Sequence, residues 1–167
     1  GDTGPASTDL LPLNNIWTGT NLFTAGLRSE GAGANSFRAG SAAGVTNQGT
    51  FTTAVGQAAG NTNQGTQATA VGVNTGYLDQ GTHAVAIGSS SGYTGQGNYA
   101  IAMGRDSGET DQGANATALG FSAGATTQGT NSVAVGNSAG STTQSVGATA
   151  VGYKAGQTAQ GEQAVAV

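Results

Sequence analysis

FTTAVGQAAGNTNQGT, residues 51–66, is the unit from which most of this chain is built. The unit recurs without insertion or deletion from residue 35 to residue 167. Its complete copies begin at Asn35, Phe51, Gln67, His83, Tyr99, Asn115, Asn131 and Gly147, and a ninth begins at Gln163. We number the positions as columns one to sixteen and the complete copies as coils 1 to 8. A constant period predicts one structural unit per repeat, each stacked on the next.

Glycine occupies column six (Gly40 through Gly152) and column ten (Gly44 through Gly156) in every complete coil. Glycine inside a helix costs about 1 kcal/mol relative to alanine, whereas at strand ends it supplies the turns with positive φ that a tight coil needs. Sixteen residues are also too few for a pair of helices. Columns two to five alternate as a short strand does, for example in Ala84-Val85-Ala86-Ile87. The sequence therefore predicts an all-β fold, a parallel β-solenoid of 16-residue coils.

Small side chains fill two columns and predict a narrow interior. Column four is alanine in every coil except the first, where it is Arg38, and column nine holds only alanine, serine or threonine. We expect column nine to lie on a second strand facing column four. Side chains alternate along a strand, so columns three and five point away from column four. The opposite orientation, with columns three and five inside and the alanines outside, is the alternative.

Columns three and five carry the larger aliphatic side chains, which we expect to form an outward stripe. Their members are Val55, Val71, Ile87, Met103, Leu119, Val135, Val151, Val85, Ile101 and Val133. A soluble protein rarely leaves such a stripe exposed, and each side chain contributes about 1.5–3 kcal/mol when fully buried. A rotational axis parallel to the solenoid would bring identical stripes together. We expect these residues to form the seam between copies of the chain.

Column fourteen is glutamine in every complete coil. These residues are Gln48, Gln64, Gln80, Gln96, Gln112, Gln128, Gln144 and Gln160. Stacked at about 4.8 Å per coil, their amides are expected to hydrogen-bond in series, as glutamine ladders do in stacked β-structure. The expected role is structural.

Columns seven, eight, eleven and thirteen vary, which is typical of a solvent face. Tyr77 and Tyr93 are successive members of column eleven, so the pair is a candidate contact for a glycan ring or a partner side chain. Phe121 and Tyr153 are further candidate surface contacts. Incidental surface aromatic residues are the simpler interpretation.

Composition argues against several functional classes. Charged residues make up 7% of the chain, the net charge is −4, and the four basic residues are scattered, so we expect no nucleic-acid binding. His83 is the only histidine and there is no cysteine, so neither a catalytic dyad nor an ordinary zinc site is available. We expect a protein that is not an enzyme, with no cofactor or metal. No apolar run is long enough to span a bilayer.

Two smaller clusters have alternative interpretations. Arg105, Asp106, Glu109 and Asp111 indicate a solvated surface more than a calcium site. Threonine fills column twelve in every coil but the one with Leu78. An ordered threonine array is typical of an ice-binding solenoid, which we keep as a minor alternative.

The segment before the repeats differs in composition. We expect residues 1–8 to be a flexible leader or the end of a collagen-like stalk, and residues 9–34 to be an N-terminal cap or docking segment with a degenerate first coil. Its large apolar side chains include Leu13, Ile16, Trp17 and Phe23. They would close the end of the solenoid or dock onto a neighbouring protein. Residues 35–167 form the repeat domain, which we expect to continue beyond residue 167.

The repeats NSVAVGNSAG (131–140), HAVAIGSSSG (83–92) and ATALGFSAG (116–124) resemble the head repeat of YadA-type trimeric autotransporter adhesins. The resemblance covers residues 35–167. It implies a left-handed parallel β-roll, a homotrimer around a central axis, and binding to host surfaces or matrix proteins. The loop that holds the glutamine and glycine is longer than in the usual family repeat.

Residues 9–23, DLLPLNNIWTGTNLF, look like segments of tailed-phage fibre and virion proteins. Together the two resemblances imply a trimeric fibre on the virion surface, a phage tail or capsid fibre, that attaches to a glycan or protein receptor on the host. The N-terminal segment would then join a neighbouring virion or stalk protein. The alternative is the head domain of a bacterial trimeric adhesin at the outer membrane.

Overall fold

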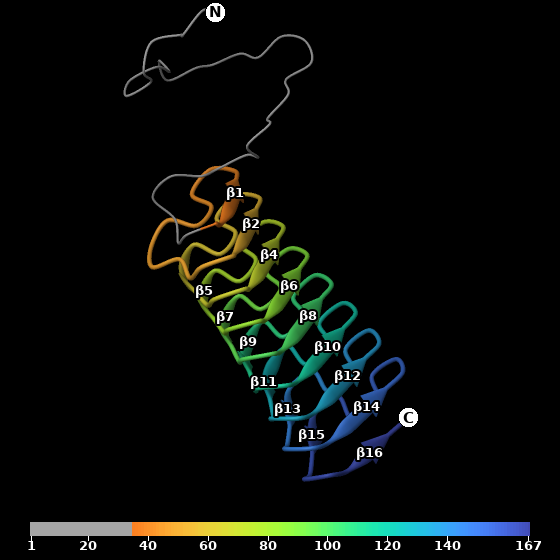
Figure 1. Cartoon of the computed structure of the whole chain (residues 1–167). Helices are drawn as coiled ribbons and strands as arrows, with labels where there is room; N and C mark the ends of the chain where they lie inside the picture. Colours follow the sequence, from red (N-terminus) through yellow and green to blue (C-terminus); the bar gives the residue numbers. More distant parts are fainter. Residues whose placement is uncertain (1–34) are drawn as a thin grey trace, which may run out of the picture.

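The computed structural model describes residues 35–167, which form a parallel β-solenoid of about eight turns (Figure 1). The described residues contain strands and turns and no helix. The all-β solenoid of 16-residue coils predicted from the repeat is thereby confirmed. The expectations for residues 1–8 and 9–34, including Leu13, Ile16, Trp17 and Phe23, fall outside the described residues.

Coils 2 to 8 each contribute one short strand to each of two parallel sheets that run along the stack, and coil 1 contributes a strand to the first sheet only (Figure 1). Columns three to five make the first sheet, with β1 (Phe37–Ala39), β2 (Thr53–Val55), β4 (Thr69–Val71), β6 (Val85–Ile87), β8 (Ile101–Met103), β10 (Thr117–Leu119), β12 (Val133–Val135), β14 (Thr149–Val151) and β16 (Val165–Ala166). The second sheet comes from columns twelve to fourteen, with β3 (Thr62–Gln64), β5 (Leu78–Gln80), β7 (Thr94–Gln96), β9 (Thr110–Gln112), β11 (Thr126–Gln128), β13 (Thr143–Gln144) and β15 (Ala159–Gln160). Partners lie sixteen residues apart, as Val71 and Ile87 do, so every column forms a straight row along the stack.

Glycine in column six allows neighbouring coils to approach closely. Gly88 directly follows β6 and has φ of 131°, a conformation that a residue with a Cβ rarely adopts. A Cβ on Gly88 would lie 2.6 Å from the carbonyl oxygen of Gly104 in the next coil. Both constraints act in the same place, which explains why this column contains nothing else.

The interior is thin and lined by small side chains. The column-four alanines, such as Ala70 and Ala86, are 0% exposed, while Val71 beside them is half-buried on the outer side of the sheet. Column two also points inward and is buried, as at Ala84. In the first coil the inward position is Arg38, whose Nη1 donates to the Gly44 carbonyl at 2.8 Å.

Column nine corrects one expectation. Its residues are buried, as at Ala59 and Ser91, but they lie in the turn between the two sheets and not on a strand. Small side chains suit a tight turn as well as a strand, so composition alone could not separate the two. The strand opposite column four is instead the one that ends at the column-fourteen glutamine.

The buried glutamines join the two sheets across the interior. In each coil from 2 to 8 the Nε2 donates to a backbone carbonyl of the first sheet eleven residues earlier, for example from Gln96 to Val85 at 2.9 Å. From Gln80 to Gln144 each Nε2 also donates to the Oε1 of the glutamine in the next coil, at 3.0–3.2 Å, so that the series ends at Gln160. The amides therefore hold each coil closed and also connect it to the next one.

This series does not extend through the first coils. Gln48 donates instead to the carbonyls of Thr46 and Gly60, and Gln64 donates to Thr53 and Ala68. The Oε1 atoms of Gln48, Gln64 and Gln80 consequently lack a hydrogen-bond partner although they are buried. The glutamine ladder thus spans Gln80 to Gln160.

Column thirteen adds a kink to the second sheet. In coils 1 to 6 this residue has positive φ, as at Asn63 (56°) and Thr127 (50°), whereas in coils 7 and 8 it does not. Asparagine and aspartate tolerate this conformation better than other residues that carry a Cβ. Their side chains form a short outer series, from Asn47 to Asn63 at 2.9 Å and from Asn63 to Asp79 at 2.7 Å.

Candidate interaction surface

The outer side of the first sheet carries the aliphatic side chains of columns three and five, which we call the aliphatic face. Its middle is the most apolar part, where Ile101, Met103 and Leu119 are 38%, 37% and 44% exposed. With nine strands about 4.8 Å apart, the face is about 38 Å long. The alternative orientation, with the alanines outside, does not occur in this structure. The ten residues named from the sequence all lie on this face, and their role as a seam between copies stays a prediction.

Charge is almost absent from the aliphatic face and from the two columns that flank it. Among residues 35–167, columns one, three, five and seven contain a single Lys, Arg, Asp or Glu side chain, Arg105, and one histidine, His83. The five acidic residues of this region occupy columns eight, eleven, thirteen and sixteen. They are Asp79, Asp106, Glu109, Asp111 and Glu162. The negative charge of the solenoid is therefore segregated from its apolar side.

Both edges of the aliphatic face are exposed and carry aromatic residues. Column one precedes each strand of the first sheet and includes Phe51 and Tyr99, which are 56% and 58% exposed. Column seven follows each strand and includes Phe121 and Tyr153, which are 42% and 73% exposed. Columns one and seven thus add apolar surface on both sides of columns three and five, from which the seam was predicted.

Tyr77 and Tyr93 lie together at the start of the second sheet, away from the aliphatic face. Their rings are stacked, with centroids 5.0 Å apart and planes 9° apart, and both side chains are half-buried. The ring faces that meet each other are no longer available to a sugar.

A second aromatic stack, which was not predicted from the sequence, lies in column one. His83 lies 5.1 Å from Tyr99 with ring planes 9° apart, one coil above the other. The signal was present, because both residues are successive members of column one, as Tyr77 and Tyr93 are of column eleven. Comparing neighbours in each column would have found the pair.

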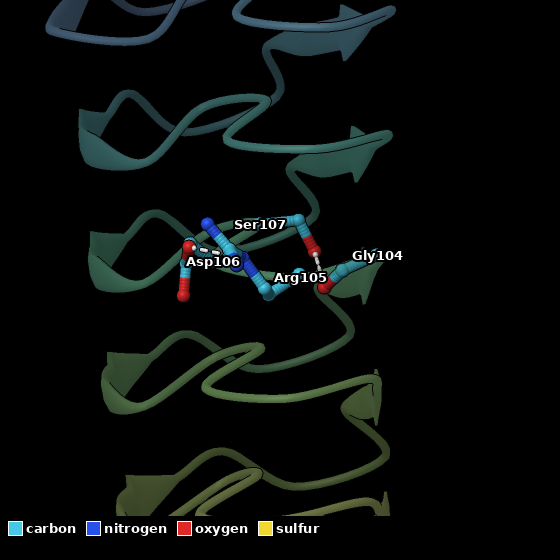
Figure 2. A network of polar contacts seen from close by, with 4 residues as sticks. All are labelled: Gly104, Arg105, Asp106 and Ser107. Carbon is cyan, nitrogen blue, oxygen red and sulfur yellow. Dashed lines mark hydrogen bonds and ion pairs between the residues drawn. The ribbon is translucent and has the colours of Figure 1, made fainter.

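The charged residues of coil 5 are divided between two places: Arg105 and Asp106 lie on the turn after β8, whereas Asp111 lies in β9. Arg105 donates from Nε to Asp106 Oδ2 at 3.0 Å, and the Ser107 hydroxyl donates to the Gly104 carbonyl at 3.2 Å (Figure 2). The Arg105 guanidinium also lies 4.7 Å from the centre of the Phe121 ring in the next coil. Arg105 is therefore held against the column-seven edge.

Burial, and secondarily the nearby Asp106 carboxylate, raises the pKa of Glu109.

Within residues 35–167, no three His, Cys, Asp or Glu side chains come together as a metal site would require. The same part of the chain has no helix with the length and apolar character needed to cross a membrane. Column twelve forms a row of half-buried and exposed threonines interrupted by Leu78.

Comparison with protein families, with curated proteins and with solved structures finds no match for this chain. The fold and its surfaces are therefore the basis for a functional proposal.

Proposed function

We propose that the chain is a structural attachment protein, in which three copies associate through their aliphatic faces into a fibre that projects from a surface. The observation that carries this proposal is the uncharged aliphatic face, about 38 Å long, on a solenoid whose acidic residues all lie elsewhere. A second copy suits such a face because its side chains repeat at the same coil spacing. Association there brings no like charges together.

The number of copies and the hand of the coil rest on the resemblance to the head repeats of YadA-type adhesins. That resemblance supports a left-handed roll and a three-fold axis parallel to the stack. The thin alanine interior supports association as well, because alanines bury little apolar surface per coil. The aliphatic side chains add about 1.5–3 kcal/mol each when a neighbour covers them.

Attachment to a host is the role that the same resemblance supports, and the segment 9–23 favours a virion fibre over a bacterial adhesin. In this proposal the protein is not an enzyme and needs no cofactor. The outward surface, made of the second sheet and its turns, is where a glycan or protein receptor would bind.

The proposal is tested first by the mass in solution, from light scattering coupled to size exclusion. We expect three times the chain mass of 16.0 kDa. A stable single chain would contradict the proposal, because the aliphatic face would then be exposed to water and not covered by another copy.

The attachment role requires a separate experiment with the purified assembly on arrays of host glycans and matrix proteins. We expect saturable binding that is lost when the assembly dissociates. Mass spectrometry of purified virions and of bacterial outer membranes then distinguishes the virion fibre from the bacterial adhesin.

A further inference from the structure

Column one keeps its side chains in an unfavourable backbone conformation. Phe51, Gln67, His83 and Tyr99 all have φ between 58° and 60°, a region that L-residues with a Cβ rarely adopt. Gly147 occupies the same column with φ of 68°, so glycine fits there. Column eight has the same backbone conformation in every coil but carries mostly small side chains such as Ala42 and Ala58, whereas column one carries aromatic residues there.

The stack of His83 on Tyr99 gives a structural role to only two of the column-one side chains. Phe51 and Gln67 have no ring partner among the described contacts, and column one is exposed in coils 1 to 7. Column seven, at the opposite edge of the aliphatic face, is exposed in all eight coils. Both edges are therefore available to a neighbouring copy.

From these edges we infer that copies of the chain meet edge to edge, with column one of one copy against column seven of its neighbour in the same coil. This inference rests on the proposed association through the aliphatic face. In a closed ring around an axis parallel to the solenoid, each copy has one neighbour at each edge, and the two contacting patches are different. Rotation without translation keeps equal coils at equal height.

Side chains that would face each other are matched in two coils. In coil 5 the Tyr99 ring would face the Arg105 guanidinium, a favourable combination of an aromatic ring and a cation. In coil 8 the only glycine of column one, Gly147, would face Tyr153, which is 73% exposed. The smallest residue of one edge thus stands opposite the bulkiest of the other.

The absence of cysteine from the chain makes thiol cross-linking a direct test. His83→Cys and Ser89→Cys place one thiol on each edge of coil 4. The two variants are co-expressed, and the assembly is treated with a short bis-maleimide. Because each chain carries a single thiol, a covalent dimer can form only between copies.

We expect about tenfold more covalent dimer from the mixture than from either variant alone, because the contact joins unlike edges. His83→Cys with Asn137→Cys is the matched control for register. Its thiols also lie on columns one and seven, but three coils apart, about 14 Å along the stack, and we expect it to cross-link as poorly as the single variants.

The mass in solution of the same preparations distinguishes a failure of the edge-to-edge contact from a failure of the proposed trimer. A trimeric mass with cross-linking only in the equal-coil mixture supports the edge-to-edge contact. A trimeric mass in which His83→Cys links to itself, or links better to Asn137→Cys, overturns the edge pairing and leaves the trimer standing. A single-chain mass overturns both.

Discussion

Gln96 donates one amide hydrogen to Oε1 of Gln112 in the next coil at 3.1 Å, and the same nitrogen donates to the Val85 carbonyl of its own coil at 2.9 Å. One buried side chain thus connects two sheets and two coils. These glutamines are the largest fully buried side chains of an interior otherwise lined by alanine, serine and threonine, so their amides have a large share in joining the two sheets.

Gln112→Met should destabilise the protein by at least about 3 kcal/mol, because several buried polar groups lose their partners. Those groups are the Ile101 carbonyl, Gln128 Oε1 and one Nε2 hydrogen of Gln96. The measurement is denaturant unfolding at fixed protein concentration. Gln57→Met, on the exposed column seven, is the control and should change stability little. Equal effects of the two substitutions would contradict the role of the ladder.

Gly88→Ala should cost about 3–5 kcal/mol, from the positive φ together with the contact with Gly104. Gly161→Ala is a matched control, because a Cβ there meets nothing within 4 Å and φ is not positive. Thermal unfolding followed by circular dichroism compares the two. If both variants melt together, close stacking at column six is not what selects glycine.

Thr127→Asn should stabilise the protein by about 1 kcal/mol, because asparagine tolerates the left-handed conformation better than a β-branched residue. Thr143 occupies the same column one coil later but without positive φ. Thr143→Asn should therefore bring no gain. A gain of similar size at both positions would argue for a general surface effect and against backbone strain.

Val135→Asn should destabilise the assembly by about 3–6 kcal/mol, because three unpaired amides would enter one apolar layer of the proposed trimer. Asn137→Ala, two residues along and exposed, should do little. Both variants are compared by melting temperature and by mass in solution. Identical behaviour would mean that the aliphatic face is not covered by another copy.

Glu109→Gln should raise the melting temperature slightly at pH 7 and leave it unchanged at pH 3. The pKa of Glu109 is raised above its model-peptide value of 4.5, so the folded chain binds this proton more tightly than the unfolded chain. Its contribution therefore favours folding below the unfolded pKa and is lost as pH rises through the folded pKa. Melting curves at the two pH values test the sign, and a lower melting temperature of the variant at pH 7 would reverse it.

Alternation and period were enough to predict the solenoid and the side on which Val71 lies, because both follow from the strand geometry of a strict repeat. Column nine was placed on a strand wrongly, since alanine and serine at Ala59 and Ser91 suit tight turns equally well. The left-handed kink at Asn63 had a signal in the asparagine, aspartate and glycine of column thirteen. The stack of His83 on Tyr99 went unnoticed because column one was considered residue by residue.

Other features have no sequence signal. All eight column-fourteen residues are glutamine, yet the side-chain series begins at Gln80 and not at Gln48. Gln48 and Gln64 donate to backbone carbonyls instead, and the repeat pattern does not record this difference. The same holds for Glu109, whose raised pKa depends on burial in coil 5.

Because the period is always sixteen residues, the length of the solenoid is set by its number of coils. Removing residues 83–98 would join Thr82 to Tyr99 and keep every column in register, with column-six glycines and column-fourteen glutamines again stacked on their own kind. Such a change shortens the molecule by about 4.8 Å without altering its cross-section. Reach can therefore be adjusted in single steps by gain or loss of whole repeats, while the surfaces that neighbours recognise stay the same.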